Sequence, residues 1–362
     1  MRRRRIHALH KYPPGIAAKV AAMTAHMRAV QLRAYDGKPE SISVVDVPKP
    51  VPGPNEVLIR VYASPINPSD LHFVRGEYGF KKPLPCIPGF EGSGTVEAAG
   101  RGLISQWLKG KRVAFAVAEA GAASGAWAQF VVTKALRAIP LRKDVDLESA
   151  ATMIVNPMMA VALMGEARSG RHRAIVQTAA ASALGKMVIR LAKRANIPVI
   201  NVVRRAEQVQ ALRGLEAQHV LDSSAPDFDA QLRSLCARLG ATIAFDAVAG
   251  TLGGRVLSAQ PKGSRIIVYG ALSGQPLPVN SGSLIFDDKR VDGMWLSRWM
   301  GARSPLRQLR AANEVQALLT GDLRSEIQAR LPLHDVARGL ELYAKDMGAG
   351  KVLLLPQEGA SA

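Results

Sequence analysis

The stretch that decides the fold of this 362-residue chain is Ile175-Val-Gln-Thr-Ala-Ala-Ala-Ser-Ala-Leu-Gly185. An apolar strand runs here into a turn of small residues and then into a helix. The helix carries its apolar residues on one face, with the 3.6-residue period: Leu184, Met187, Val188, Leu191 and Ala192. A second apolar strand follows at residues 199–203. This order predicts a βαβ unit that opens on a phosphate-binding turn, because small side chains let a pyrophosphate approach the backbone and the helix N-terminus supplies N–H groups.

The end of the second strand indicates which dinucleotide binds. An acidic residue at this place would hold the ribose hydroxyls of NAD, but here Arg204 and Arg205 follow the strand and no carboxylate is near. Guanidinium groups attract the 2′-phosphate, so the sequence predicts NADPH. Only Gly185 remains of the three glycines of the fingerprint, which leaves an ordinary βα turn of another doubly wound protein as the alternative.

Charge and hydropathy limit the class of protein. The formal net charge is +19, and residues 1–26 contain six Lys and Arg and no acidic residue, so about +13 is spread over the rest. No nucleic-acid-binding motif accompanies this charge, and nucleic acid is not expected as a partner. No apolar run reaches the roughly 18 residues of a membrane span, and no membrane partner is expected.

Residues 1–26 are expected to form no part of the folded protein. They are Arg-rich and show no strong periodicity, whereas strand-like sequence starts at Met27. We interpret them as a disordered extension or the product of an upstream start codon, in a cytoplasmic protein. The alternative is an organellar transit peptide, which would place the protein in mitochondria.

The rest of the chain divides into a β-rich part, an alternating part and a return. Residues 27–150 are rich in short strands separated by Pro and Gly clusters, at 30–33, 42–47, 56–63, 94–99, 111–115 and 128–132. Residues 147–168 are expected to be helical with a break at Asn156-Pro157. In residues 151–304, strands at 174–178, 199–203, 219–222, 241–247 and 264–269 alternate with helices, which predicts a parallel sheet. Residues 305–362 contain two further helices and a strand at 351–355, and we expect them to return to the first part.

This layout resembles the medium-chain dehydrogenase/reductase superfamily over residues 27–357. The resemblance rests on six stretches in order: Asn67-Pro-Ser-Asp70, Gly76-Glu-Tyr-Gly79, Pro88-Gly-Phe-Glu-Gly92, Val155-Asn-Pro157, Tyr269-Gly-Ala-Leu272 and Gly293-Met-Trp-Leu-Ser-Arg-Trp299. Within the superfamily the chain is similar to the zinc-free quinone reductases and the mitochondrial-type 2-enoyl thioester reductases. The resemblance implies an α/β protein, with a GroES-like β-rich catalytic domain, a Rossmann domain with a doubly wound parallel sheet, and a homodimer.

The residues at the zinc positions argue against a metal. Zinc alcohol dehydrogenases of this superfamily carry Cys where Asn67 stands and His where Phe90 stands. Phe90 cannot bind a metal ion and Asn67 is a poor zinc ligand, so no metal is expected. Alcohol oxidation without a Lewis acid loses its main electrostatic support, whereas the conjugated carbonyl of an activated alkene or a quinone accepts the electrons itself.

Two residues are candidates for catalysis. In the enoyl thioester reductases the proton donor is the tyrosine of the Gly-x-Tyr-Gly stretch, which matches Tyr78. A phenol with its usual pKa near ~10 keeps its proton at neutral pH. The alternative for Tyr78 is simple packing beside Phe80. Asn67 is expected to line the same pocket, or else to cap the turn that begins at Pro68.

The resemblance also implies a set of coenzyme-binding residues. They are Asn156, Ala181, Ser182, Ala183, Leu184, Gly185, Arg204, Arg205, Tyr269, Gly270, Ala271, Leu272, Met294, Trp295, Leu296 and Lys351. Trp295 has a place in the core as its alternative, and Lys351 has a solvated position at a strand end. We interpret Asp246 as structural rather than as a base.

The prediction is therefore an NADPH-dependent reductase whose substrate is a small molecule, a 2-enoyl thioester or an enone. The first alternative is an NADPH:quinone reductase. The enoyl reductases commonly have a Thr-Ala pair after the Asn-Pro, where this chain has Met158-Met159, and this departure argues against the enoyl thioester as substrate and not against the fold. The second alternative is a non-catalytic NADPH- or RNA-binding protein of the same fold.

Overall fold

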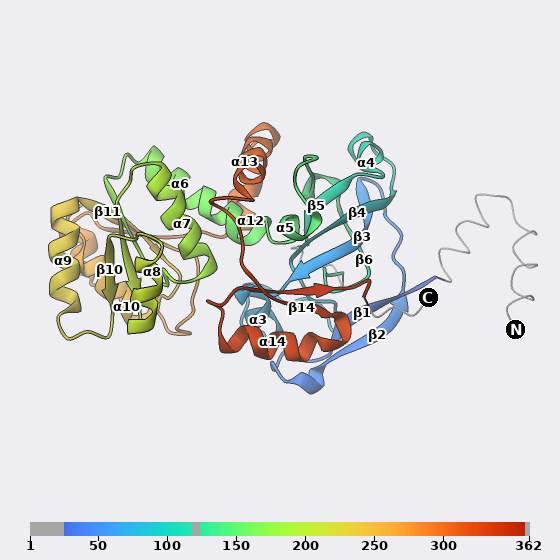
Figure 1. The fold of residues 1–362 in the computed structure, drawn as a ribbon, viewed down its shortest axis with the longest axis horizontal. Helices are drawn as coiled ribbons and strands as arrows, with labels where there is room; N and C mark the ends of the chain where they lie inside the picture. The colour runs from blue at the N-terminus through green and yellow to red at the C-terminus, as the bar shows by residue number, and fades with distance from the viewer. Residues whose placement is uncertain (1–24, 118–123, 359–362) are drawn as a thin grey trace, which may run out of the picture. The chain divides into compact units, whose positions relative to one another are not determined.

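The computed structural model describes residues 25–117 and 124–358, which form two compact units (Figure 1). Unit 1 runs up to Ile154 and resumes at Glu326, and unit 2 comprises Val155–Ser325. The chain was expected to return to the first part from residue 305. Instead α13 (Pro305–Leu318) belongs to unit 2, where it buries Ala311, Ala312 and Val315. The extension expected over residues 1–26 lies, up to residue 24, outside the described residues.

Unit 1 is built on mostly antiparallel strands. They are β1 (His26–Leu32), β2 (Ile42–Pro48), β3 (Glu56–Pro65), β4 (Glu91–Ala99), β5 (Arg112–Ala116), β6 (Phe130–Lys134), β7 (Ala138–Pro140), β14 (Ile327–Pro332) and β15 (Lys351–Leu355). Seven of them form one sheet in the order β14-β15-β3-β4-β5-β7, with β6 on β3, and β1 pairs with β2. β15 pairs antiparallel with β3, so the last strand of the chain joins the first part, as the sequence predicts.

The helices of unit 1 are short except for the last. They are α3 (Pro68–Val74), α4 (Leu103–Leu108), α5 (Leu147–Ala151) and α14 (Val336–Lys345), with 3-10 turns at η2 (Pro39–Ser41), η3 (Ala135–Arg137) and η5 (Leu333–Asp335). α14 packs on β15 and β14 (Figure 1). One apolar core includes Phe73 of α3, Phe90, Trp127 and Tyr343 of α14.

Unit 2 has the sheet that the alternating pattern predicts. Its strands are β8 (Ala174–Gln177), β9 (Val199–Val203), β10 (His219–Asp222), β11 (Ala241–Asp246), β12 (Arg265–Val268) and β13 (Arg290–Gly293). They lie in the order β10-β9-β8-β11-β12-β13 and every neighbouring pair is parallel. Counted along the chain this is the order 3-2-1-4-5-6 of dinucleotide-binding sheets. The predicted fold class, an α/β protein with a Rossmann sheet and a β-rich domain, is confirmed.

Helices cover both faces of this sheet (Figure 1). After the π-helical turn η4 (Ile154–Met158) come α6 (Met159–Ser169), α7 (Ala183–Arg194), α8 (Ala206–Arg213), α9 (Phe228–Leu239), α10 (Gly250–Ala259), α11 (Ser281–Phe286) and α12 (Leu296–Gly301). α6 packs on α7, and α9 packs on α10. The π-helical turn holds Asn156-Pro157, where the sequence predicts a break in the helix.

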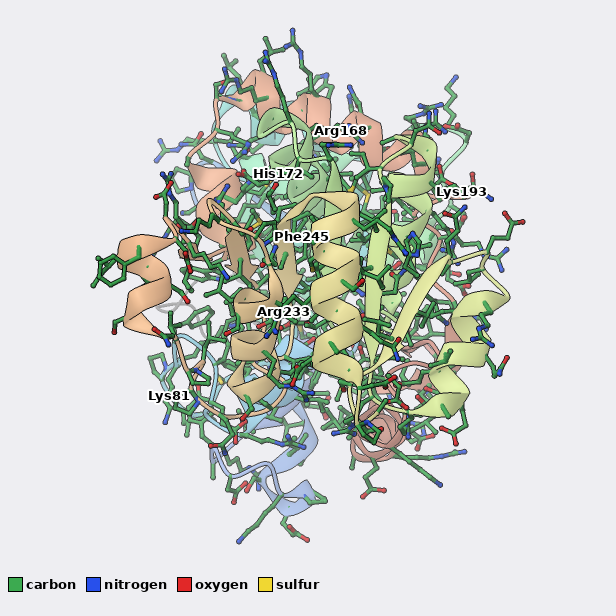
Figure 2. All side chains as sticks on the ribbon, turned by 90° about the vertical axis from the view of Figure 1, so that its left-hand side faces the viewer. Lys81, Arg168, His172, Lys193, Arg233 and Phe245 are labelled. Carbon is green, nitrogen blue, oxygen red and sulfur yellow. The ribbon has the colours of Figure 1, made fainter. Side chains whose placement is uncertain are left out.

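Positive charge is spread over unit 2 rather than gathered at one place. In Figure 2, Arg168 of α6, Lys193 of α7 and Arg233 of α9 stand on three different helices. Some of this charge is locally balanced, because Lys193 pairs with Glu216 and Arg168 with Glu314. Within the described parts of the chain, no helix combines the length and the apolar character that crossing a bilayer requires.

Candidate active site

The turn between β8 and α7 has the geometry of a phosphate-binding turn. Ser182 is the N-cap of α7, and its Oγ accepts a hydrogen bond of 3.1 Å from the backbone N–H of Gly185. A Cβ added at Gly185 would lie 2.4 Å from the carbonyl oxygen of Ala180. Only glycine therefore lets the first turn of the helix lie this close to the strand end, which is the role of the third glycine in a dinucleotide fingerprint.

Buried polar side chains hold this turn in place through hydrogen bonds. Gln177, at the end of β8, donates from Nε2 to the carbonyl oxygen of Gly185 (3.1 Å) and to Oδ1 of Asn201 in β9 (2.7 Å). Asp246 accepts at Oδ1 from Thr178 Oγ1 (2.6 Å) and at Oδ2 from the backbone N–H of Ala249 (3.1 Å). Asp246 is fully buried, so these contacts support the structural role that the sequence predicts for it.

Arg204 and Arg205 follow β9, and both side chains are exposed. No carboxylate pairs with either of them among the residues that the structure describes. Arg205 is the N-cap of α8, so both guanidinium groups stand where that helix also directs its positive end. This is a place for an anion, and two unpaired guanidinium groups favour a phosphate.

Two further segments leave the sheet on the other side of β8. Residues 269–272 follow β12, and the backbone N–H groups of Tyr269 and Leu272 donate to Asp246 and Ala247 at 2.9 and 3.0 Å. Met294 follows β13 and donates to Val268 at 2.8 Å. The Tyr269 hydroxyl is buried, and no described residue forms a hydrogen bond with it; burial raises its pKa, so it keeps its proton. Trp295 is 42% exposed, which contradicts its alternative place in the core.

Most of the predicted coenzyme residues thus meet at one edge. The segments 181–185, 204–205, 269–272 and 294–296 follow β8, β9, β12 and β13, and parallel strands end at the same edge of the sheet. The strand order reverses at β8, which is where such sheets bind ligands. Asn156 and Lys351 do not belong to this edge, since Asn156 lies in η4 and Lys351 begins β15 of unit 1. Their contact with a coenzyme stays a prediction.

Lys351 instead takes part in a buried polar cluster in unit 1, which comprises Asn67, Asp70, Glu91, Tyr343 and Lys351. Asn67, just before α3, donates from Nδ2 to Oε1 of Glu91 at 2.9 Å. Its Oδ1 accepts from Lys351 Nζ, which also donates to the Tyr343 hydroxyl at 3.3 Å. The other oxygen of Glu91 accepts from the backbone N–H of Ile154 at 2.9 Å. Lys351 is 1% exposed, so its alternative as a solvated lysine at a strand end is wrong.

Burial shifts the pKa values of this cluster. Burial lowers the pKa of Lys351 to about 8, although the carboxylates of Glu91 and Asp70 oppose this. Burial raises the pKa of Asp70 to about 7, the nearby charge of Glu91 adds to this rise, and the Asn67 backbone N–H opposes it. Desolvation also raises the pKa of Tyr343, which keeps its proton. The cluster therefore holds protons that can shift near neutral pH.

Asp70 shows why Asn67 stands where it does. Asp70 Oδ2 accepts a hydrogen bond of 2.9 Å from the backbone N–H of Asn67, which is one half of a capping box at the start of α3. Its other oxygen is buried, and no described residue forms a hydrogen bond with it. Asn67 therefore both caps α3 and presents its side chain to the buried cluster. Asp70, Glu91 and Tyr343 were not predicted as members of a site, although Asp70 and Glu91 lie in stretches that carry the family resemblance.

Tyr78 lies in the loop after α3 and packs among aromatic rings. Its ring centroid is 4.8 Å from that of Phe90 and 5.2 Å from that of Phe80. The predicted alternative, packing beside Phe80, is therefore observed, and it is compatible with catalysis. Phe90 directly precedes Glu91, so the ring that supports Tyr78 is covalently next to the carboxylate that binds Asn67. Phe90 and Glu91 thus connect the two predicted catalytic residues along the chain, and a pocket shared by Tyr78 and Asn67 stays a prediction.

Metal ligands are not gathered in the described part of the chain. Among its residues, no group of three or more His, Cys, Asp and Glu side chains is arranged to hold a metal ion. At the two positions in question, the Asn67 amide bonds to Glu91 and Lys351, and Phe90 packs on Phe73 and Tyr78.

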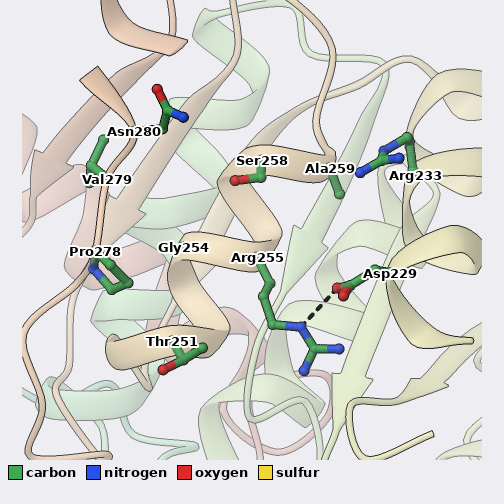
Figure 3. A pocket seen from close by; sticks show the side chains of 10 residues that line it. All are labelled: Asp229, Arg233, Thr251, Gly254, Arg255, Ser258, Ala259, Pro278, Val279 and Asn280. Atoms are coloured by element: carbon green, nitrogen blue, oxygen red, sulfur yellow. Dashed lines mark hydrogen bonds and ion pairs between the residues drawn. The ribbon is translucent and has the colours of Figure 1, made fainter. Parts of the chain in front are cut away.

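A hollow in unit 2 is lined by a different set of residues (Figure 3). It measures about 460 Å³ and is lined by α9, α10 and residues 278–280. Arg255 and Asp229 pair within it at 2.8 Å, so their charges balance each other. None of the residues that line this hollow is a predicted site residue, and it adds nothing to the candidate site.

Known proteins are similar to this chain in both fold and sequence. Residues 53–143 match the family model of the alcohol dehydrogenase GroES-like domain, and residues 183–311 match that of the zinc-binding dehydrogenases. The mitochondrial enoyl-[acyl-carrier-protein] reductase of Arabidopsis thaliana is 31% identical over 271 residues, which are 73% of this chain and 71% of that protein. The crystal structure of a candidate NADPH:quinone reductase from Mesorhizobium loti is 36% identical with a TM-score of 0.84, covering 91% of this chain and 98% of that one. A mycobacterial protein in complex with NADPH is 27% identical with a TM-score of 0.77, covering 91% of this chain and 100% of that one.

Proposed function

We propose that this chain, which belongs to the medium-chain dehydrogenase/reductase family in the branch of the quinone reductases and mitochondrial enoyl reductases, is an NADPH-dependent reductase of an activated carbon–carbon double bond. The observation that carries this is the pair of exposed guanidinium groups at the end of β9, which no carboxylate of the described residues pairs with, beside a turn that only Gly185 allows. The substrate is a small molecule, a 2-enoyl thioester or an enone.

The residues at the carboxyl edge of the unit 2 sheet fit NADPH. The N-terminus of α7 and the turn 181–185 bind the pyrophosphate, because backbone N–H groups point out of the helix there. Arg204 and Arg205 bind the 2′-phosphate. The Tyr269 hydroxyl, a buried donor that lacks a described partner, suits a polar atom of the nicotinamide half. Gly270 to Leu272 and Met294 to Leu296 line the same half with backbone groups.

The protein residues supply position and a proton. When bound, NADPH supplies the hydride. In the substrate the π bond of the alkene breaks and a C–H bond forms at the β-carbon, which leaves negative charge on the carbonyl oxygen. A second C–H bond then forms at the α-carbon and removes this charge. Tyr78 donates the proton to the α-carbon from its hydroxyl. Asn67 acts as a positioning residue, because Lys351 and Glu91 hold its amide group in one orientation.

A second candidate function is NADPH:quinone reductase. The observation that favours it is the aromatic wall of unit 1, in which Tyr78, Phe80 and Phe90 pack ring to ring. Such a wall suits a flat apolar quinone, which needs no particular proton donor. The two functions differ in what they demand of the Tyr78 hydroxyl.

The test compares Tyr78→Phe with the wild type. We expect the variant to lose about 100-fold or more of its kcat for crotonyl-CoA with NADPH, because general-acid catalysis contributes about 10²–10⁴. Tyr62→Phe on β3 is the matched control, since that ring is exposed, and it should leave kcat unchanged. A loss of only a few-fold would remove Tyr78 as the acid. Turnover of 1,4-benzoquinone that survives Tyr78→Phe, without crotonyl-CoA turnover in the wild type, would favour the second candidate.

The edge of the unit 2 sheet supports the proposal of a homodimer. β13 is the end strand, and α11 next to it exposes Ile285 and Phe286 by 71% and 77%. An open strand edge beside apolar side chains is a typical interface between copies. Ile285→Asp should reduce the mass measured by sedimentation equilibrium to that of a monomer, and an unchanged mass would place the interface elsewhere or show a monomeric wild type.

The location stays a proposal. We place the protein in the cytoplasm, and mitochondria are the alternative if the Arg-rich residues 1–26 serve as a transit peptide. The N-terminus of the native protein, determined by mass spectrometry, distinguishes the two.

A further inference from the structure

Helix α4 of unit 1 presents apolar side chains to solvent. Leu103 is 92% exposed and Trp107 57% exposed, and Ile104 is 48% exposed beside them. Leu136 in η3, which packs next to α4, is 67% exposed. The helix is anchored from its other side by Ser105 and Leu108, which are buried. We call Leu103, Ile104, Trp107 and Leu136 the α4 patch.

Exposed apolar groups of this size are unusual when they gather at one place. A single exposed leucine needs no explanation, because much of any protein surface is apolar. Here three of the six residues of one helix, including a tryptophan, are exposed together with a leucine of the adjoining turn. Such a cluster marks a surface that another molecule covers.

The charges around the α4 patch indicate the nature of that molecule. Residues 101–112 contain Arg101, Lys109, Lys111 and Arg112 and no acidic residue. Arg101 and Lys109 are exposed, and no carboxylate pairs with either among the residues that the structure describes. Lys111 Nζ lies 3.2 Å from the centroid of the Trp107 ring, so a cation and an aromatic ring stand together at the surface. An apolar centre with a cationic rim is complementary to a surface that is anionic outside and apolar inside.

We propose that the α4 patch docks this protein onto a membrane surface containing anionic lipids, with Leu103 and Trp107 inserted at the boundary between headgroups and acyl chains and Arg101, Lys109 and Lys111 at the phosphates. Tryptophan prefers the interfacial region of a bilayer, and each nearby Lys or Arg adds attraction to an anionic surface. The nearly complete exposure of Leu103 favours a deformable lipid surface over a protein partner, because a protein would have to supply a matching pocket.

A membrane partner was not expected from the sequence, because no apolar run is long enough to span a bilayer. The α4 patch needs no such run, since it would lie on a membrane without crossing it. The contact also leaves the residues of the proposed active site untouched. Its test is therefore independent of the reductase activity.

The test measures co-sedimentation of the full chain with vesicles. Vesicles of phosphatidylcholine alone are compared with vesicles in which about a third of the lipid is phosphatidylglycerol, at low and high salt. We expect binding to the anionic vesicles that weakens with salt. Leu103→Ser/Trp107→Ser and Arg101→Glu/Lys109→Glu should each weaken it about tenfold or more. Leu306→Ser/Leu309→Ser on α13 and Lys143→Glu/Lys345→Glu are matched controls, since they remove exposed leucines or reverse two exposed charges elsewhere.

A second measurement reports insertion directly. Brominated acyl chains quench a tryptophan that enters the bilayer, so vesicle binding should quench part of the wild-type fluorescence. Trp107→Phe should still bind but lose this quenching. Three results would overturn the proposal: no binding to anionic vesicles at low salt, equal loss in the patch and control variants, or binding without Trp107 quenching. Binding to poly-L-glutamate with no binding to vesicles would overturn it in favour of an acidic protein partner.

Discussion

Replacing Lys351 by methionine tests whether the buried polar cluster is one electrostatic unit. The ammonium of Lys351 is 1% exposed and donates to Asn67 Oδ1 and to the Tyr343 hydroxyl. Methionine keeps most of the volume but removes the charge, so the carboxylate of Glu91 stays buried without its cation. Leaving a buried charge without its compensating partner costs about 3–5 kcal/mol, and we expect the free energy of unfolding to fall by this amount.

The double variant Lys351→Met/Glu91→Gln gives the decisive comparison. Burial lowers the pKa of Lys351 to about 8, which means that the ammonium is less stable in the cluster than in water even beside Glu91. The two opposite charges, which both bond to Asn67, therefore contribute little net stability, and removing both should cost far less than the sum of the two single variants. We expect a coupling free energy of about 2 kcal/mol or more.

Urea unfolding of all four proteins, followed by tryptophan fluorescence, measures this coupling. Lys345→Met, at the exposed end of α14, is the matched control and should change the free energy of unfolding by less than about 0.5 kcal/mol. Single variants whose costs add within about 0.5 kcal/mol would refute the cluster as a coupled unit. A Lys351→Met variant as stable as the wild type would show that the buried ammonium does not compensate Glu91 at all.

Three further predictions concern the coenzyme turn and the buried carboxyl. Arg204→Ala/Arg205→Ala should raise KM for NADPH about tenfold or more and leave KM for NADH unchanged in steady-state assays, because only the 2′-phosphate loses charge-assisted bonds; equal changes for both coenzymes would contradict this. Gly185→Ala should destabilise unit 2 by about 1–3 kcal/mol in thermal or urea unfolding, since its Cβ would lie 2.4 Å from Ala180 O, whereas Gly165→Ala meets nothing within 4 Å and should not. The pKa of Asp70 is raised to about 7, so protonation stabilises the fold and this stability is lost as pH rises through 7. Asp70→Asn should therefore lose less stability than the wild type between pH 5.5 and 8, by about 2 kcal/mol in urea unfolding, and equal losses would exclude Asp70 as the titrating group.

The parallel sheet of unit 2 could be predicted because its information is local. Each buried strand is a short apolar run, each helix has its own 3.6-residue period, and parallel strands must end at one edge. The place of the turn at 181–185 and of Arg204 and Arg205 followed from that local pattern, whereas residues 269–272 were assigned to the coenzyme from the family resemblance. β13 was not predicted, because the prediction relied on apolar runs and the residues Arg290–Gly293 are mostly exposed and form no such run.

Two elements at the surface of unit 1, α4 and β14, were not predicted from the sequence either. α4 has only six residues, three of which are exposed and apolar, so its pattern has no periodic face that a helix prediction can use. β14 mixes Gln328, Arg330 and Pro332 with its apolar residues and is ordered mainly by its parallel pairing with β15. Such elements exist because of a neighbour far away in the chain.

Lys351 marks the limit of local reasoning most clearly. Next to Val-Leu-Leu-Leu, a lysine at the start of a strand is expected either in solvent or, from the family resemblance, at the coenzyme. The structure buries it, because β15 is not an edge strand but lies between β14 and β3. Its Nζ then bonds to Asn67, 284 residues earlier in the chain. A charged residue beside an apolar run can thus signal a buried partner of opposite charge. Glu91 gives no such signal, because Gly92, Ser93 and Gly94 follow it at the start of β4. Only one of the two buried charges therefore stands out in the sequence, and the meeting of the starts of β4 and β15 could not be predicted from it, although a buried charge is stable only when it is compensated.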